Sequence, residues 1–317
     1  MTRFLLLLLV AACTTVRVHD SMLEEMRAES RANPQARLDR VISRIREPLD
    51  LPADRAAFTL PFELAPVPTV RGTLNGIEAR FAVDTGASSI TIFAPLARKA
   101  GVYVAPNVEP GVAVSPGHQR RVYVGAARKL ELGPLRVRSL PVLIAAEQQM
   151  RSGWLNDPYY DGIIGGALLT QYNVEFDMRK EELRFTPHNR RGQASVIFTT
   201  VTLNGARYRM LVDSGANGLF IEPWAAKELQ LIDDAEAESL SASASSAADV
   251  KMGYVRIERV SVDGKKFQGV AAGVVATFGR DSRPADGERL AGLLGFTGFG
   301  KRVWTINYET LQLHLDE

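Results

Sequence analysis

From Val67 to the end of the chain, short apolar runs alternate with polar residues, glycine and proline. The runs are rich in Val, Ile, Leu and Phe, which favour strands, and the residues between them favour turns. The clearest runs are Phe81–Val83, Ile90–Phe93, Val122–Val124, Leu140–Ile144 and Ser195–Phe198. The pattern predicts a mainly β protein whose first strand lies at Thr59–Leu64, with hairpin turns at Gly133-Pro134 and Asp263-Gly264.

Helices are predicted to be few and brief. Pro95–Ala100 and Pro223–Leu229 each begin with a proline, which suits the first helical turn because its missing N–H is not needed there. Residues Asp20–Arg46 carry apolar side chains at helical intervals, and Pro34 divides them into two helices. Ser239–Ala248 consists of small residues without periodicity, which predicts a mobile stretch, either a flap or a plain surface loop.

The chain contains the same pattern twice. In the first part of the pattern, every matching pair is separated by the same number of residues, so the two copies align without a gap. The matching segments are Thr73–Gly76 with Thr202–Gly205, Arg80 with Arg209, Val83–Ala87 with Val212–Ala216, and, further on, Asp161–Gly165 with Leu290–Gly295. Each copy then ends in segments that are predicted to form strands. Self-similarity over this length predicts a duplicated lobe. A polar stretch at Pro187–Ala194 joins the two copies.

Bulk composition fits two lobes in one globular chain. The 317 residues are enough for two cores, and 46% hydrophobic with 23% charged residues is ordinary for a folded protein. The formal net charge of +2 is too small to suggest a surface that binds a polyanion, so nucleic acid is not an expected partner.

The first residues predict a lipoprotein signal peptide. Met1-Thr2-Arg3 supplies a positive tip, and Phe4–Val10 is apolar but too short to span a bilayer. Val10–Cys13 resembles the bacterial lipobox, in which the cysteine carries the lipid of the mature protein. Cys13 is the only cysteine, so no internal disulfide is possible. The alternatives are a signal peptide that discards Cys13 and an uncleaved anchor.

The candidate chemistry lies at Asp84 and Asp213. In both copies an apolar strand runs into the acid, a glycine follows two residues later, and a second apolar strand leaves. The carboxyl is therefore expected on a tight turn between buried strands. Two carboxyls close together in a partly desolvated cleft cannot both ionise cheaply, so they share one proton, and one acts as base and the other as acid.

No cofactor or metal is expected, because the four histidines are scattered and no His-Glu-x-x-His segment occurs.

These paired motifs resemble the aspartic proteases, and specifically the retropepsin-like proteins of bacteria in which two retroviral-type lobes are fused in one chain. The resemblance covers residues from about 60 to 317. It implies two pepsin/retropepsin-like β-barrel lobes related by a pseudo-twofold axis. It also implies that Asp84 and Asp213 are the catalytic pair, and that Thr85 and Ser214 lock the two turns together.

Four glycines are predicted to support the site: Gly86, Gly215, Gly165 and Gly295. They would permit a close approach that a side chain obstructs, although each taken alone could serve ordinary turn chemistry. The predicted boundaries are 1–13 for the signal peptide and lipobox, 14–58 for a helical stalk or pro-segment, 59–190 for lobe 1 and 191–317 for lobe 2.

The predicted function is an aspartic endopeptidase that cuts extended segments of proteins. It is predicted to act as a monomer, because both acids lie in one chain. Its predicted location is the bacterial envelope, lipid-anchored and facing the periplasm, with Thr14 after Cys13 favouring the outer membrane by resemblance to lipoproteins. One rival is a peptide-binding lipoprotein that keeps the fold without cutting. Another is a latent protease masked by its N-terminal segment. Gly111–Gly117 is the expected flap of lobe 1, and Trp154–Tyr160 is expected either to shape a pocket or to cover a lobe edge.

Overall fold

A computed structural model describes residues 49, 51, 55–105, 111–115, 118–145, 160–190, 196–243, 251–278 and 287–316 of the chain, with the backbone alone described for 111–115 and 118–120. Cys13, nearly all of the predicted stalk and the segment Trp154–Tyr159 lie outside these residues. The described part is mainly β, as the apolar pattern predicts.

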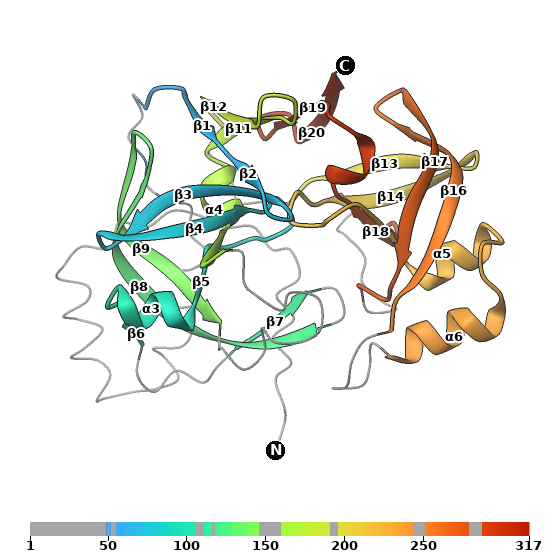
Figure 1. Cartoon of the computed structure of the whole chain (residues 1–317), viewed down its shortest axis with the longest axis horizontal. Coiled ribbons are helices and arrows are strands. Elements are labelled where there is room, and N and C mark those ends of the chain that lie inside the picture. Colours follow the sequence, from blue (N-terminus) through green and yellow to red (C-terminus); the bar gives the residue numbers. More distant parts are fainter. Residues whose placement is uncertain are drawn as a thin grey trace.

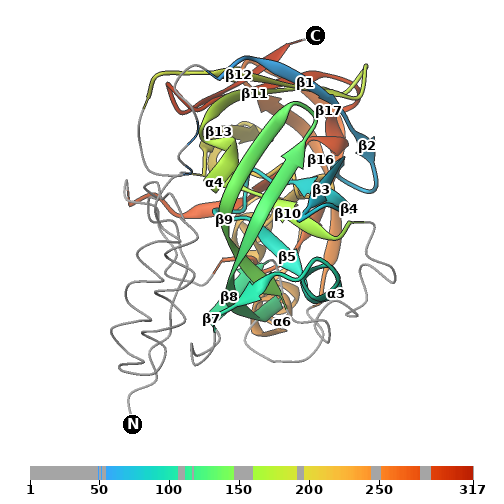
Figure 2. The ribbon, with the colours of Figure 1, turned by 90° about the vertical axis from the view of Figure 1, so that its left-hand side faces the viewer.

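The first lobe, called lobe one below, is a closed barrel of six strands (Figure 1, left). In spatial order they are β3 (Pro68–Leu74), β4 (Ile77–Val83), β10 (Gly162–Ile164), β5 (Thr91–Phe93), β9 (Leu135–Ala145) and β8 (His118–Leu132). The barrel closes because β3 pairs again with β8, Thr73 lying opposite Glu131. Strands β2 (Glu63–Leu64), β6 (Tyr103–Val104) and β7 (Gly111–Ser115) extend this sheet. Figure 2 faces this lobe and shows the β8–β9 hairpin crossing the front of the barrel.

The second lobe, lobe two, repeats that barrel strand for strand (Figure 1, right). Its order is β13 (Phe198–Leu203), β14 (Ala206–Val212), β18 (Leu290–Leu294), β15 (Leu219–Ile221), β17 (Lys265–Val274) and β16 (Gly253–Val262), and β16 closes on β13. The duplication read from the sequence is therefore a duplicated barrel. The predicted fold class is confirmed.

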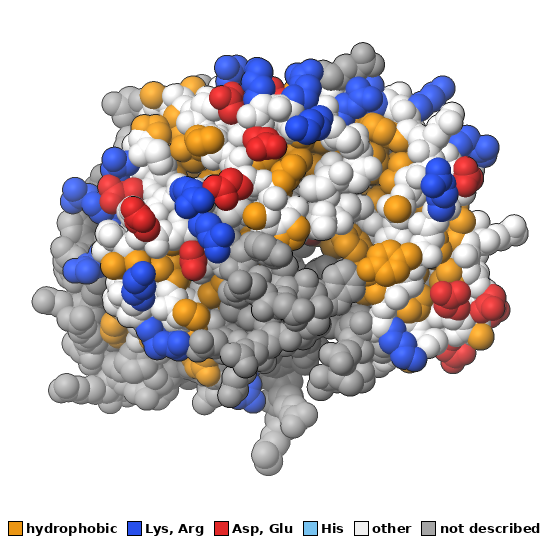
Figure 3. Space-filling model, viewed as in Figure 1, with side chains coloured by type: hydrophobic (Ala, Val, Ile, Leu, Met, Phe, Trp, Pro, Cys, Tyr) orange, Lys and Arg blue, Asp and Glu red, His pale blue; other side chains and the backbone are white. Residues whose placement is uncertain are grey.

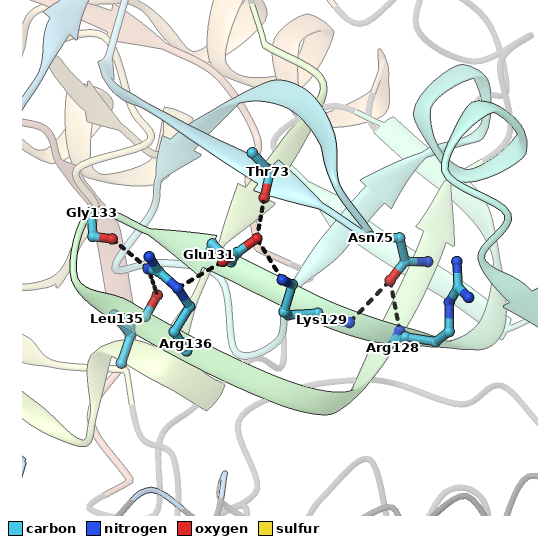
Figure 4. Close-up of polar contacts among 8 residues, drawn as sticks. All are labelled: Thr73, Asn75, Arg128, Lys129, Glu131, Gly133, Leu135 and Arg136. Carbon is cyan, nitrogen blue, oxygen red and sulfur yellow. Dashed lines mark hydrogen bonds and ion pairs between the residues drawn. The ribbon is translucent and has the colours of Figure 1, made fainter.

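The repeated Asn-Gly pair explains how each barrel is held closed. Asn75 and Asn204 both adopt the left-handed backbone conformation, with φ of 52° and 48°. The side-chain oxygen of Asn75 accepts hydrogen bonds from the backbone N–H groups of Arg128 and Lys129 on β8 (Figure 4). The Asn204 oxygen accepts one from Arg259 on β16. Each tight turn thus binds the strand that closes its own barrel.

Charged side chains on the outside of lobe one surround the same closure. Glu131 accepts a hydrogen bond from Thr73 on β3 at 3.0 Å and forms ion pairs with Lys129 and Arg136 at 3.0 and 2.7 Å (Figure 4). Both cations are half exposed, so their attraction is screened by solvent and adds little stability. The Thr73–Glu131 bond joins the two strands directly.

A third sheet joins the lobes and lies across the top of Figure 1. Its strands, in spatial order, are β1 (Phe58–Pro61), β12 (Glu182–Pro187), β11 (Tyr172–Asp177), β19 (Val303–Asn307) and β20 (Gln312–Asp316). Strand β11 of the first copy pairs antiparallel with β19 of the second. Beneath it, the rings of Phe296 and Trp304 stack at 4.6 Å, and Phe176 meets Phe296 edge-on. The predicted opening strand is confirmed as β1 and β2.

The two predicted helices are confirmed as α3 (Ala94–Lys99) and α5 (Pro223–Glu228), and both carry a proline in the first turn. Two further turns, α4 (Gly166–Leu169) and η2 (Thr297–Phe299), follow the closing motifs. The predicted hairpin turns at 133–134 and 263–264 are confirmed. Within the described residues, no helix combines the length and apolar character needed to cross a membrane.

Helix α6 (Asp234–Ser243) corrects the prediction of a mobile stretch at Ser239–Ala248. Residues 239–243 are helical, while 244–248 lie outside the described residues. The physical reason is burial: Ala237 and Leu240, three residues apart on one helix face, are buried. The residues of the low-complexity run alone do not predict this helix, because the buried Ala237 that helps to anchor it lies before the run.

Candidate active site

Each repeated acid stands at the end of a barrel strand. Asp84 follows β4 and Asp213 follows β14. The backbone N–H of Asp84 donates to the carbonyl oxygen of Ile164 at 3.0 Å, and that of Asp213 donates to Leu294 at 3.0 Å. The closing apolar motif of each lobe therefore fixes the position of its own acidic turn.

The structure brings the two carboxyls together across the lobe interface. A methyl group placed on Gly86 would lie 2.6 Å from Cγ of Asp213, and one placed on Gly215 would lie 2.5 Å from Cγ of Asp84. Each carboxyl thus rests against the glycine of the opposite turn, and the two carboxyls are in hydrogen-bonding contact. The glycines matter here because a side chain would occupy the space of the acids.

Thr85 and Ser214 cross-link the two turns with four hydrogen bonds. The Thr85 hydroxyl donates to the carbonyl oxygen of Val212 at 3.0 Å and accepts from the N–H of Ser214 at 3.0 Å. The Ser214 hydroxyl donates to Val83 at 2.6 Å and accepts from the N–H of Thr85 at 3.1 Å. Both side chains are buried, so these bonds are shielded from water and hold the acids at a fixed separation.

The pair is arranged to keep a proton. Burial raises the pKa of Asp84, although hydrogen bonds from Asp213 and from the N–H groups of Ala87 and Gly86 oppose the rise. Burial raises the pKa of Asp213 further, well above its ordinary value, and the nearby charge of Asp84 adds to the effect. As pH rises, the pair therefore loses one proton well before the other, and the two carboxyls share the proton that remains. One carboxylate and one carboxylic acid lie side by side.

The closing glycines allow strands to pass against the acidic turns. A methyl group on Gly165 would lie 2.3 Å from the carbonyl oxygen of Ser89, and one on Gly295 would lie 2.2 Å from that of Ala216. These contacts are to backbone atoms, which cannot swing aside. In both lobes the glycine is therefore a packing requirement behind the turn.

Among the described residues, no group of three or more His, Cys, Asp or Glu side chains is placed to hold a metal ion. The chemistry that the described geometry offers is that of two carboxyls sharing a proton.

Comparison with known proteins agrees with the paired lobes. The sequence model for aspartyl protease matches residues 70–166 and 199–297, one stretch in each lobe. The chain belongs to the aspartyl protease family. Among solved structures it is similar to a retropepsin-like aspartic protease from Rickettsia conorii, with 16% identity, a TM-score of 0.28, and coverage of 41% of this chain and 89% of that chain. A comparison with curated proteins found no match.

The segment of lobe one that was expected to be a flap forms a hairpin. Strand β7 (Gly111–Ser115) pairs with the first part of β8, from Val122 back to His118. Figure 1 shows this hairpin on the side of lobe one that faces lobe two. Residues 116 and 117 lie outside the described residues, and the role of the hairpin as a flap stays a prediction.

Sequence reasoning missed one buried acid of lobe two. Glu222 stands where lobe one has Phe93, and its carboxylate accepts hydrogen bonds from the N–H groups of Thr277 and Phe278 at 2.6 and 2.9 Å. It thereby holds the segment that leaves β17. Burial raises the pKa of Glu222 to about 7, with those two bonds opposing the rise. The sequence feature that could have identified Glu222 is its position between an apolar strand and Pro223.

We predict that Glu222→Gln gains stability over the wild type as pH rises. The folded protein holds a proton up to about pH 7 that the unfolded chain releases near 4.5. The free energy of unfolding of the wild type therefore falls through this window, by up to about 3 kcal/mol from this group. Urea unfolding of both proteins at about pH 5 and about pH 8 measures the change. An identical difference between the proteins at the two pH values would contradict it.

A second prediction concerns the cross-link between the turns. Thr85→Val should lower the free energy of unfolding by about 2–4 kcal/mol, because it leaves the N–H of Ser214 and the oxygen of Val212 buried without their partner. Thr69→Val is the matched control, since among the described residues the buried hydroxyl of Thr69 bonds only to the nearby Val67 oxygen. Urea unfolding should show a clearly smaller loss for the control. Equal losses would argue against a special role for Thr85.

Proposed function

We propose that this chain is an aspartic endopeptidase in which Asp84 and Asp213 form the catalytic dyad. The observation that carries the proposal is the opposition of the two carboxyls, each against the glycine of the other turn, with both pKa values raised. Membership of the aspartyl protease family supports the same reaction class.

In the proposed reaction, the ionised member of the Asp84/Asp213 dyad accepts a proton from a water molecule as the oxygen of that water attacks the carbonyl carbon of a peptide bond. The protonated partner donates a hydrogen bond to the carbonyl oxygen, which becomes an oxyanion. The C–N bond then breaks, the amine leaves with a proton from the dyad, and a carboxylic acid and an amine are the products. The single negative charge of the dyad passes to the oxyanion in the intermediate and returns to the pair when the amine takes its proton.

The proposed substrates are extended segments of other proteins. A cleft between two β lobes suits a strand-like ligand, and both acids come from one chain, so a monomer is sufficient. Gly86, Gly215, Gly165, Gly295, Thr85 and Ser214 would maintain the geometry of the dyad rather than take part in proton transfer.

Cleavage of a diverse peptide library tests this proposal. Protein comprising residues 14–317 is incubated with the library from acid to neutral pH, beside an Asp84→Asn variant. New peptide termini that appear with the wild type and not with the variant support the protease. Wild-type protein that binds peptides without cutting them would favour the peptide-binding alternative.

A silent wild type would require one further comparison, with protein that starts at residue 48. This truncation keeps Leu49, which packs in the core, and Arg55, whose guanidinium donates to the backbone oxygens of Gln171 and His188. A gain of activity on truncation is the outcome that a masking N-terminal segment predicts.

We further propose that Cys13 carries a lipid that anchors the enzyme in the bacterial envelope, facing the periplasm. The sequence Val10–Cys13 supports this proposal. In a bacterial host, the wild type should take up labelled fatty acid and sediment with membranes, and Cys13→Ser should do neither. Membrane recovery that is the same for both proteins would exclude the lipid on Cys13 as the anchor.

A further inference from the structure

His188 lies directly after β12, on the segment that joins the two lobes, and its side chain is 8% exposed. Both ring nitrogens have a backbone partner. Nδ1 lies 3.2 Å from the backbone nitrogen of Arg190, and Nε2 lies 3.0 Å from the carbonyl oxygen of Thr170. A backbone N–H can only donate, so Nδ1 accepts from Arg190, and Nε2 carries the proton that is donated to Thr170. These two contacts require a neutral imidazole.

Thr170 connects His188 to α4, because it is the residue that ends this helix. Its N–H and its hydroxyl both donate to the carbonyl oxygen of Gly166, at 3.1 and 2.6 Å. Thr170 is itself buried, so these bonds are shielded from water. His188 therefore holds the C-terminal end of α4 from the segment between the lobes.

The N-terminal end of α4 holds the acidic turn of lobe one. The N–H of Gly166 donates to the carbonyl oxygen of Ala87 at 2.7 Å. The N–H of Ala167 donates to that of Ser88 at 3.0 Å. Ala87 in turn donates its N–H to the carboxylate of Asp84 at 2.9 Å. A continuous chain of hydrogen bonds thus leads from the ring of His188 through α4 to one acid of the dyad.

Lobe two is built differently behind its own acidic turn. The short turn η2 takes the place of α4, and Gly300 stands where lobe one has Thr170. Glycine has no hydroxyl, so the bonds that close α4 at Thr170 cannot all form there. The chain of hydrogen bonds that starts at His188 therefore supports the turn of Asp84 in particular.

The surroundings of His188 oppose a positive charge on the ring. Burial lowers the pKa of His188 below its ordinary value of 6.5, although the bond to Thr170 and the charge of Glu309 oppose this change. The guanidinium of Arg55, which donates to the backbone oxygen of His188 at 3.1 Å, lowers the pKa further, as does Arg190. Lys and Arg side chains also gather along the upper edge of Figure 3, where the third sheet lies. The ring is therefore neutral at neutral pH and takes up its proton only in acid.

We propose that His188 is a positioning residue for the dyad: its neutral imidazole holds α4 behind the acidic turn of lobe one, and protonation of the ring in acid releases it. The added proton enters on Nδ1, where the N–H of Arg190 already points, and two donors cannot face one another at 3.2 Å. The ring then shifts, and the turn that carries Asp84 loses its support. The inference rests on the proposed endopeptidase function and adds to it a residue that controls the loss of activity in acid.

The test uses two substitutions of His188 with opposite expectations. His188→Gln places an amide N–H near the position of Nε2 and does not titrate, so it should keep most of kcat at neutral pH. Its ratio of kcat at about pH 4.5 to kcat at about pH 7 should exceed the wild-type ratio by at least about threefold. His188→Leu removes both contacts and should lower kcat at least about tenfold at about pH 7, with KM changed by less than about twofold. His314→Gln, at an exposed histidine of β20, is the control and should keep the wild-type profile.

NMR separates this inference from the proposed function, because it needs no cleavage. The nitrogen shifts of the His188 ring should place the proton on Nε2 at neutral pH. The amides of Gly166 and Ala167 should exchange at least about tenfold faster, relative to their intrinsic rates, once the wild-type ring is protonated, and His188→Gln should not show this change. These results support the proposal even where no peptide is cut. A proton on Nδ1 at neutral pH overturns it, and so does the same pH dependence of α4 exchange in the wild type and His188→Gln, whether or not His188→Leu folds.

Discussion

Asp213→Asn should lower kcat at least about a thousandfold while leaving the fold intact. An amide has nearly the volume of the carboxyl and can still accept the hydrogen bond that the N–H of Gly215 donates at 2.9 Å. It cannot release a proton to the leaving amine, and general acid–base catalysis by one such group is worth about 10²–10⁴ in rate. Asp84→Asn should have a comparable effect, because the two groups act as one unit.

The stability of the Asp213→Asn variant distinguishes a loss of catalysis from a loss of folding. Burial holds the pKa of Asp213 well above its ordinary value, so ionisation of the pair costs folding free energy as pH rises. Asp213→Asn removes that cost and should be at least as stable as the wild type at neutral pH. Loss of cleavage together with retained stability assigns the acid to the reaction.

Asp234→Asn is the control for this comparison, since Asp234 is exposed on α6 and, within the part of the chain that the structure describes, pairs only with exposed Lys227 at 3.1 Å. It should change neither rate nor stability by much. Cleavage at the wild-type rate by Asp213→Asn would remove the dyad from the proposed mechanism. A large drop in stability would instead make the acid a structural group.

The duplicated barrel and the two acidic turns could be predicted because their determinants are local and occur twice. An apolar run into Asp-Thr-Gly or Asp-Ser-Gly fixes a strand and a turn in each copy, whatever the rest of the chain does. The Asn-Gly pairs were visible as a repeat for the same reason. The hydrogen bonds that their asparagine side chains accept could not be predicted, because the partner N–H groups on β8 and β16 lie more than 50 residues further on.

The features that could not be predicted depend on register between distant strands. Pairing of β11 with β19 joins the two copies, and nothing near Val174 or Ile306 specifies that match. That Phe220 packs against the outer cluster containing Leu293, and not in the main core, also follows only from strand pairing. A one-residue slip would turn the side chain to the core. Glu222 was missed because a buried acid is visible only once its backbone partners are known.

The second large effect should come from Gly215→Ala. Its added methyl group would lie 2.5 Å from Cγ and 2.6 Å from Oδ2 of Asp84, well inside van der Waals contact. The carboxyl at the end of a side chain can move aside, so the protein should fold at a cost of about 1–3 kcal/mol. The displaced Asp84 no longer meets Asp213 in the geometry of proton transfer. Activity should therefore fall at least about a hundredfold.

Gly295→Ala provides the contrast that makes this result specific. There the methyl group would meet the backbone oxygens of Ala216 and Gly218 at 2.2 and 2.5 Å, and the turn itself must move. We expect this variant to lose stability more than Gly215→Ala does. Gly298→Ala, whose nearest contact would be 3.4 Å, is the control for both. Calorimetric unfolding and peptide cleavage on all three variants test the argument. Full activity in Gly215→Ala would mean that the carboxyls do not need to touch the opposite turns, and the packing of each acid against its partner glycine would then have no part in catalysis.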